Sequence, residues 1–320
     1  MSKVIVFTAF LTAFLFGCVS GGGQPRSENN IKPGQTVGEK EALGEIDIYT
    51  EIAIYSDRIL QNGNDIKSYN QRGIRYVELM RYAEAYNDFT RAIEIAPNDP
   101  VAYHYRGNLN CTMENYDEGM ADYNKAIEVD KNYYDVYNDR GTIFAKLGQY
   151  DEAIADYMKG IELNPSSPAL HYNLGSLYKI LGKYQEALTC LDKAISYDRE
   201  YVPAYIQRGN VYFDLKRYGD AFVNFHRAIG IDPASINAYV GRGIVNVVTG
   251  KYEAALADFS RAVQLDPNHI LALQDRAGVY SKLGRYQEAL SDLNAILAID
   301  PNFVPALEDR ELVYQKLGRN

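Results

Sequence analysis

The sequence predicts an all-α fold, a solenoid of repeated helix–turn–helix units, and three observations lead to this prediction. A small residue recurs every 34 positions, at Gly73, Gly107, Gly141, Gly175, Gly209, Gly243 and Ala277. A tyrosine follows each of these positions after nine residues, at Tyr82, Tyr116, Tyr150, Tyr184, Tyr218, Tyr252 and Tyr286. A second small residue follows after twelve, and a large one after sixteen, at Phe89, Tyr123, Tyr157, Leu191, Phe225, Phe259 and Leu293.

Within each unit, the spacing predicts two helices joined by a turn. The first runs for about a dozen residues to a turn such as LGQY at 147–150, and the second begins at phrases such as DEAIADY at 151–157. Glycine inside a helix costs about 1 kcal/mol relative to alanine, so we expect it to allow close approach of the two helices. The predicted units are 66–99, 100–133, 134–167, 168–201, 202–235, 236–269 and 270–303.

Period, Gly-x-x-Tyr, Ala-x-x-x-Phe and terminal proline together resemble the tetratricopeptide repeat (TPR). The resemblance covers 66–303 and implies a right-handed superhelical solenoid. Residues 304–320 read as the first helix of an eighth unit that acts as a cap, and 42–61 as a helix that packs on the amino end. Tyrosine usually stands where the family has tryptophan.

An arginine precedes the small residue where the family usually has leucine, and an aspartate follows it after sixteen residues. We expect these residues to pair across each hairpin, with a solvated arginine as the alternative. The predicted pairs are Arg72 and Asp88, Arg106 and Asp122, Arg140 and Asp156, Arg242 and Asp258, and Arg276 and Asp292. The fourth unit lacks both partners, with Leu174 and Cys190, and the fifth combines Arg208 with Asn224.

The amino-terminal segment predicts export and lipid attachment. An apolar run at 4–16 has the length of a signal-peptide core, so residues 1–17 are the expected signal peptide. It ends in Leu15-Phe16-Gly17-Cys18, which resembles a bacterial lipobox, with Phe16 bulkier than usual. Cys18 is therefore the expected acylation site, palmitate being one expected chain, and 18–41 a flexible tether. An ordinary signal peptide is the alternative. We expect the outer membrane facing the periplasm, or the cell surface.

Charge and ligand chemistry exclude several functions. The formal charge of -9, without a run or stripe of Lys and Arg, argues against nucleic-acid binding. The four histidines have no metal-ligand spacing to a cysteine or to each other, and we expect neither metal nor cofactor. Cys111 and Cys190 lie more than two repeats apart and are expected to be free thiols. No catalytic motif stands apart from the repeats, so we expect no enzyme.

The TPR resemblance places a partner in the groove lined by the first helices. The stripe at helical spacing opposite the buried one is polar in units two to four, with His104, Asn108, Asn138, Thr142, Lys146, Tyr172, Ser176 and Lys179. It is mostly apolar in units five and six, with Ile206, Asn210, Phe213, Val240, Ile244, Val247 and Val248. We expect the apolar stretch to be the main partner site, with core packing as the alternative. The lysine of a chaperone-type carboxylate clamp is absent from the position three before the small residue.

The sequence therefore predicts a membrane-anchored scaffold or adaptor of the bacterial cell envelope that binds a protein or peptide partner. Two alternatives stay open. One is a regulatory subunit of an envelope enzyme, for example a peptidoglycan-processing enzyme, and the other is a self-associating structural lipoprotein. The partner and the oligomeric state are not fixed by the sequence.

Overall fold

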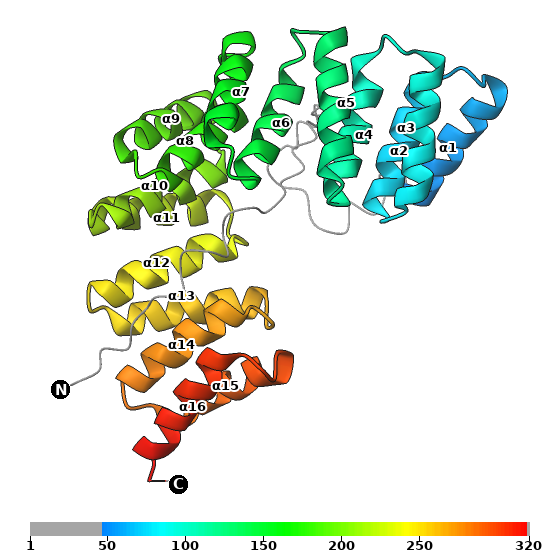
Figure 1. Cartoon of the computed structure of the whole chain (residues 1–320). Helices are drawn as coiled ribbons and strands as arrows, with labels where there is room; N and C mark the ends of the chain where they lie inside the picture. Colours follow the sequence, from blue (N-terminus) through cyan, green and yellow to red (C-terminus); the bar gives the residue numbers. More distant parts are fainter. Residues whose placement is uncertain (1–46, 319–320) are drawn as a thin grey trace, which may run out of the picture. The chain divides into compact units, whose positions relative to one another are not determined.

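The computed structural model describes residues 47–318, which form α-helices and no β-strand. The helices are α1 (Ile48–Gln61), α2 (Ile66–Glu78), α3 (Tyr82–Ile95), α4 (Pro100–Thr112), α5 (Tyr116–Val129), α6 (Tyr134–Lys146), α7 (Tyr150–Leu163), α8 (Pro168–Ile180), α9 (Tyr184–Tyr197), α10 (Val202–Asp214), α11 (Tyr218–Ile231), α12 (Ile236–Val248), α13 (Tyr252–Leu265), α14 (Ile270–Lys282), α15 (Tyr286–Ile299) and α16 (Val304–Lys316) (Figure 1). The all-α prediction is thereby confirmed for these residues. The predicted signal peptide and tether lie outside them.

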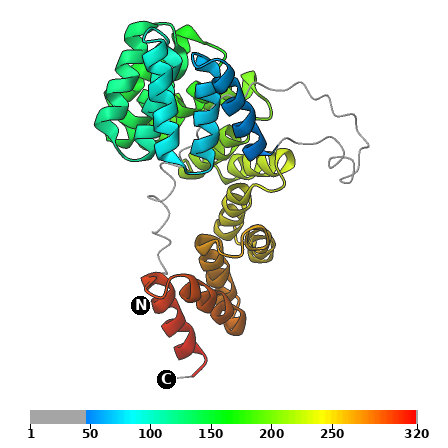
Figure 2. The same cartoon turned by 90° about the vertical axis from the view of Figure 1, so that its right-hand side faces the viewer.

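Two compact units divide the chain, the first ending at Pro165 and the second beginning at Ser166. In the first unit, α1 packs on α2, and the hairpins α2/α3, α4/α5 and α6/α7 follow in chain order. In the second, the hairpins α8/α9, α10/α11, α12/α13 and α14/α15 are followed by α16, which packs on α15 (Figures 1 and 2). Each predicted 34-residue unit thus contains one hairpin.

Local signals set the helix ends. Asp99 and Ser167 cap α4 and α8 with their side chains, and a proline follows each as the first helical residue. Gly148 ends the turn after α6 with a φ of +78°, a left-handed conformation that glycine adopts at little cost. The helix boundaries therefore follow from residue chemistry that repeats along the chain.

The recurrent glycine allows the close approach that we expected, and its nearest neighbour is the large residue of the second helix. A Cβ atom at Gly73 would lie 2.5 Å from Phe89 Cε1, and one at Gly243 would lie 2.6 Å from Phe259 Cε1. Only in some hairpins does the small residue of the second helix also come close, as where Gly119 O lies 3.1 Å from such a Cβ at Gly107. The ring therefore occupies the volume that a side chain would need.

All five predicted arginine and aspartate pairs are brought together as bidentate ion pairs. In each, arginine Nη2 lies 2.6 to 2.7 Å from aspartate Oδ1, and Nε donates to the same carboxylate. The arginine side chains are only 17 to 19% exposed, so they do not lie on a solvated face. In the fifth unit, Arg208 Nε donates to Asn224 Oδ1 at 2.8 Å.

The same arginines also reach the preceding second helix. The Nη1 of Arg140 lies 2.6 Å from Asn124 Oδ1 on α5, and the Nη1 of Arg106 lies 3.2 Å from Thr90 Oγ1 on α3. The corresponding group of Arg242 contacts His226 on α11 at 2.8 Å. Except for Arg72, whose Nη1 bonds to Ser56 on α1, each such arginine therefore joins two successive second helices across the first helix that carries it. We call this arrangement the arginine bridge.

Removing one arginine bridge should cost stability in a way that removing both partners does not. Arg140→Leu leaves Asp156, which is 5% exposed, without its main donor, and we expect a loss of about 1 to 3 kcal/mol in the free energy of unfolding. Arg140→Leu with Asp156→Cys copies the Leu174 and Cys190 combination and should recover most of the loss, as measured by urea unfolding.

Arg91→Leu is the matched control, because Arg91 pairs at 2.8 Å with Glu94 on an exposed helix face. We expect that change to alter stability by less than about 0.5 kcal/mol. Additive losses in the Arg140 and Asp156 double variant would contradict a coupled pair.

Candidate protein-binding surfaces

The first helices of successive hairpins form the inner layer of each unit. In the first unit, α2 packs on α4 and α4 on α6, and in the second, α8, α10, α12 and α14 pack in succession. Among the described helices, successive second helices make no comparable contact. The first helices are therefore the more closely spaced layer, and they supply the inner surface of a unit.

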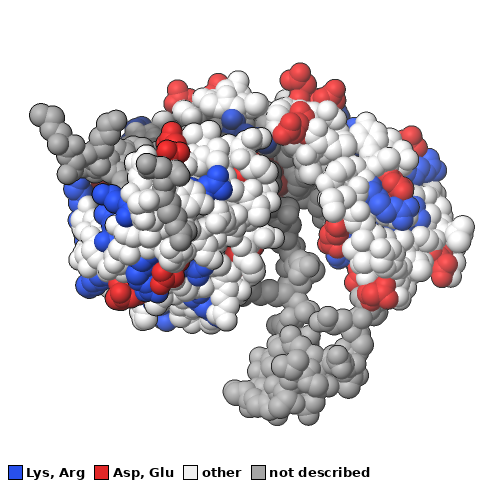
Figure 3. Space-filling view, turned by 90° about the horizontal axis from the view of Figure 1, so that it is seen from below, with Lys and Arg blue, Asp and Glu red and all other residues white. Residues whose placement is uncertain are grey.

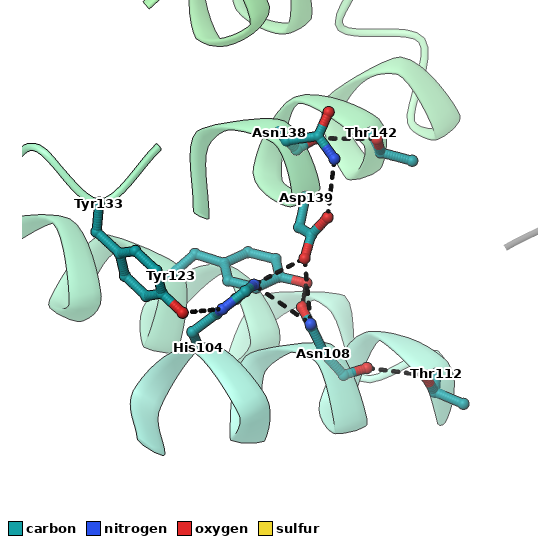
Figure 4. A network of polar contacts seen from close by, with 8 residues as sticks. All are labelled: His104, Asn108, Thr112, Tyr123, Tyr133, Asn138, Asp139 and Thr142. Carbon is teal, nitrogen blue, oxygen red and sulfur yellow. Dashed lines mark hydrogen bonds and ion pairs between the residues drawn. The ribbon is translucent and has the colours of Figure 1, made fainter. Parts of the chain in front are cut away.

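A polar network occupies the inner surface of the first unit (Figure 4). His104 Nε2 lies 2.7 Å from Asp139 Oδ2, and His104 Nδ1 lies 2.9 Å from the Tyr133 hydroxyl. Asn108 Nδ2 donates to the same Asp139 oxygen at 3.1 Å, while its Oδ1 accepts the Tyr123 hydroxyl at 2.6 Å. The network ties α4 to α6, and His104 is buried within it.

The exposed end of this network is the Asp139 carboxylate, whose side chain is 28% exposed. Asn138 Nδ2 donates to Asp139 Oδ1 at 3.1 Å, and Thr142 Oγ1 donates to the Asn138 carbonyl at 2.9 Å. Lys146 Nζ lies over the Tyr116 ring, 5.0 Å from its centre. Of the predicted polar residues, His104, Asn108 and Asn138 are thus brought together around an aspartate that the sequence analysis missed.

Tyr133, His104 and Asp139 form a row of hydrogen bonds like that of an acid–base relay. Burial raises the pKa of the Tyr133 hydroxyl, so the neutral phenol is favoured. Within residues 47–318, no group of three His, Cys, Asp or Glu side chains could hold a metal ion.

Charge and thiol chemistry give no further reactive site in the described part of the chain. On the face in Figure 3, Lys and Arg are interspersed with Asp and Glu. Cys111 is a buried free thiol whose pKa burial raises to about 11, and Cys190 is a half-buried free thiol. No helix among these residues is long and apolar enough to cross a bilayer.

The predicted apolar surface of the second unit is smaller than expected. Val248 on α12 is 48% exposed, and Ile206, Phe213 and Ile244 are half-buried. Val240 and Val247 are buried, at 5% and 8% exposure, so the prediction that water reaches them is wrong.

The physical reason for this burial is that α12 packs on both α10 and α14. Side chains directed at a neighbouring first helix fill the gap between the helices and never reach the groove. Helical spacing gives the direction of a side chain, but it does not show how closely the next helix approaches.

Polar residues flank the apolar surface. Asn210 Nδ2 donates to Gln207 Oε1 at 3.1 Å, and Lys179 Nζ lies 3.3 Å from Asp214 Oδ2. The Tyr172 ring meets the Tyr201 ring edge-on at 5.7 Å, and burial raises the pKa of the Tyr172 hydroxyl. Each of these polar groups therefore already has an interaction partner within the unit. The aliphatic side chains are the main groups of this surface that a binding partner could cover.

Asp275 on α14 is a buried acid that the sequence pattern did not predict. It is 4% exposed, and within the described structure its Oδ2 has no hydrogen-bond partner. Burial raises the pKa of its carboxyl to about 7, with no charged neighbour contributing. The signal in the sequence is faint, because aspartate at this position also occurs as Asp139 and Asp309, which do have partners.

Comparison with family models identifies the class of protein. Models of the tetratricopeptide repeat match residues 66–99, 102–133, 122–155, 141–180, 175–215, 202–235 and 251–318. These matches together span well over half of the chain. The chain belongs to the TPR family, and the resemblance inferred from its motif is confirmed.

Solved structures share the fold at low identity. A chain of the APC/C hetero-tetramer Cut9–Hcn1 has a TM-score of 0.65 and 17% identity, over 84% of this chain and 53% of the other. Yeast Tom70 has a TM-score of 0.63 and 18% identity, over 85% and 59%. The Pseudomonas aeruginosa protein pilF has a TM-score of 0.58 and 18% identity, over 68% and 100%. This chain thus spans only about half the length of the Cut9–Hcn1 chain.

Curated proteins give no significant match to the sequence.

Asp275 should make stability depend on pH. Its pKa of about 7 in the fold exceeds the ordinary value of 3.8, so the folded state binds the proton more tightly than the unfolded chain. The contribution of protonated Asp275 to the free energy of unfolding is complete below pH 3.8, falls as pH rises towards 7, and is lost above 7. The total loss should reach at most about 4 kcal/mol.

Asp275→Asn keeps the shape but cannot ionise, so the difference in stability between wild type and variant should change over this pH window. Urea unfolding at several pH values measures it. A difference that stays constant from pH 4 to 8 would show that Asp275 does not carry the effect.

Proposed function

We propose that the protein is a membrane-anchored scaffold or adaptor of the bacterial cell envelope, with its main partner site on the inner surface of the second unit. TPR proteins are typically non-enzymatic interaction scaffolds, and the repeats of this chain support a role in binding another protein. Envelope location and anchoring are parts of the proposal that follow from the residues before position 47.

The observation that carries the partner site is the partly exposed aliphatic surface on α10 and α12. Ile206 packs beside the core around Phe225, and Val248 stands 48% exposed at the end of α12. Aliphatic side chains that converge on the inner face of a repeat array lose unfavourable hydration when a partner covers them. A partner segment with apolar side chains therefore fits this surface.

A charge placed on this surface should prevent partner binding without unfolding the protein. Val248→Glu introduces a carboxylate at an exposed position, so we expect loss of partner recovery in crosslinking pull-downs from the native envelope and little change in melting temperature. Val223→Glu is the control, because Val223 is 64% exposed on a second helix, α11, of the same unit. That variant should recover the partner normally.

Equal recovery with Val248→Glu and Val223→Glu would place the partner elsewhere, and the network of His104, Asn108 and Asp139 would become the better candidate. Self-capture as the only crosslinked species would favour a self-associating lipoprotein. Turnover of a cell-wall substrate by the purified protein would favour an enzymatic role.

Lipid attachment at Cys18 is the second part of the proposal. The lipobox-like Leu15-Phe16-Gly17-Cys18 supplies the only cysteine in the first 110 residues. Cys18→Ala should abolish metabolic labelling with palmitate and release the protein from the membrane fraction, because acyl chains contribute about 0.8 kcal/mol for each buried CH₂. Cys190→Ala, on α9, is the control and should leave labelling intact. Unchanged labelling and membrane retention in Cys18→Ala would contradict the anchor.

A further inference from the structure

A pocket of about 500 Å³ lies in the first unit, where the turn between α1 and α2 meets the beginnings of α2 and α4. Its size is within the range of ligand-binding pockets. The polar residues that matter for its chemistry are Asp65, Lys67, Asn70, Gln71, Asp99 and Tyr105. None of these residues belongs to the network around His104 or to the apolar surface of the second unit.

Asn70 supplies a buried acceptor that has no partner. Asn70 lines the pocket and is 5% exposed, and its Oδ1 makes no hydrogen bond within the described structure. A buried amide oxygen left unpaired costs about 1 to 3 kcal/mol, so a ligand with a hydrogen-bond donor would recover that energy.

Comparison with other repeats shows that Asn70 lacks the carboxylate that its counterparts bond to. His104 and Gln274 stand at the same repeat position as Asn70, and each bonds to a carboxylate 35 residues later, Asp139 and Asp309 respectively. The residue 35 positions after Asn70 is Tyr105. The position 35 residues after Asn70 therefore holds no carboxylate, and Asn70 and Tyr105 both line the pocket.

The charges around the pocket favour a cation. Asp99 caps α4 by accepting the Val101 amide on Oδ1 at 3.0 Å, which leaves its second oxygen without a hydrogen bond in the described structure. Burial raises the pKa of the Tyr105 hydroxyl, and the negative charges of Asp135 and Asp99 raise it further. Two cations lie near these carboxylates: Lys67 in the pocket lining, and Arg58, whose charge lowers the pKa of Asp65. Asp65 also accepts a hydrogen bond from the Ser68 hydroxyl.

We propose that this pocket binds an arginine side chain of the partner protein. A guanidinium group offers planar donors to the oxygens of Asn70 and Asp99 and a flat face to the Tyr105 ring. The chain already surrounds its own arginines in this way, since Arg72 pairs with Asp88 and lies over the Tyr69 ring at 5.7 Å. The inference rests on the proposed scaffold function and specifies the chemistry of the partner.

The test uses the isotope-labelled full chain and two peptides, acetyl-Gly-Gly-Arg-Gly-Gly-amide and its counterpart with citrulline, which has nearly the shape of arginine without its charge. The arginine peptide should shift the amide signals of Asn70, Gln71 and Tyr105 saturably, and the citrulline peptide should bind at least about tenfold more weakly. Raising the salt concentration should weaken the binding of the arginine peptide, because salt screens the attraction between charges.

Asp99→Asn keeps a good helix cap but loses the charge, and Asn70→Ala loses the acceptor, so each should weaken the arginine peptide by about fivefold or more. Asp117→Asn is the control, because Asp117 is an exposed acid on α5 outside the pocket, and it should bind normally. Circular dichroism establishes that each variant is folded.

Equal binding of the two peptides, equal binding by wild type and Asp99→Asn, or shifts confined to other residues would overturn the arginine site. The scaffold function would survive that result, because partner recovery and its loss in Val248→Glu are measured separately. Conversely, arginine binding with no partner recovered from the envelope would leave the pocket standing and count against the scaffold.

Discussion

The arginine bridge is the interaction on which the arrangement of successive hairpins depends. The aspartates that accept it are only 4 to 6% exposed. Carboxylates at such positions are stable only with donors that replace water, and the arginine fork supplies two of them. Because the remaining nitrogen bonds to the preceding second helix, as Arg140 does to Asn124, each bridge fixes a hairpin against its predecessor as well as closing it.

This arrangement separates structure from recognition. The arginine, aspartate and glycine positions hold the hairpins together, so the side chains on the inner face can differ from one repeat to the next. The first unit uses that freedom for the polar network of His104 and Asp139, and the second for the aliphatic surface around Val248. The repeat without an arginine, which carries Leu174, is the first of the second unit. A single fold thus offers two chemically distinct surfaces.

Much of this could be predicted, because contacts inside one hairpin recur at a fixed separation in sequence. The sixteen-residue spacing from Arg140 to Asp156 is visible seven times over as presence, absence or replacement of a pair. Contacts between hairpins were harder to predict. Val240 was expected to be exposed because its helical direction is correct for the groove, yet the approach of α10 and α14 buries it. That approach depends on side-chain volumes on three helices, which no single period encodes.

One position between first helices shows how local chemistry decides the outcome. The residue three before the small position faces, on the next first helix, the residue 35 later in the sequence, as His104 faces Asp139. Where histidine or glutamine meets aspartate, the contact is closed by a hydrogen bond. Where Asn70 precedes Tyr105, the carboxylate is absent and both residues line a pocket. Where Val240 precedes Asp275, the acid finds no donor and its pKa rises to about 7. The same backbone arrangement therefore gives a hydrogen-bonded contact, an unpaired amide oxygen or a buried acid with a raised pKa, according to one pair of side chains.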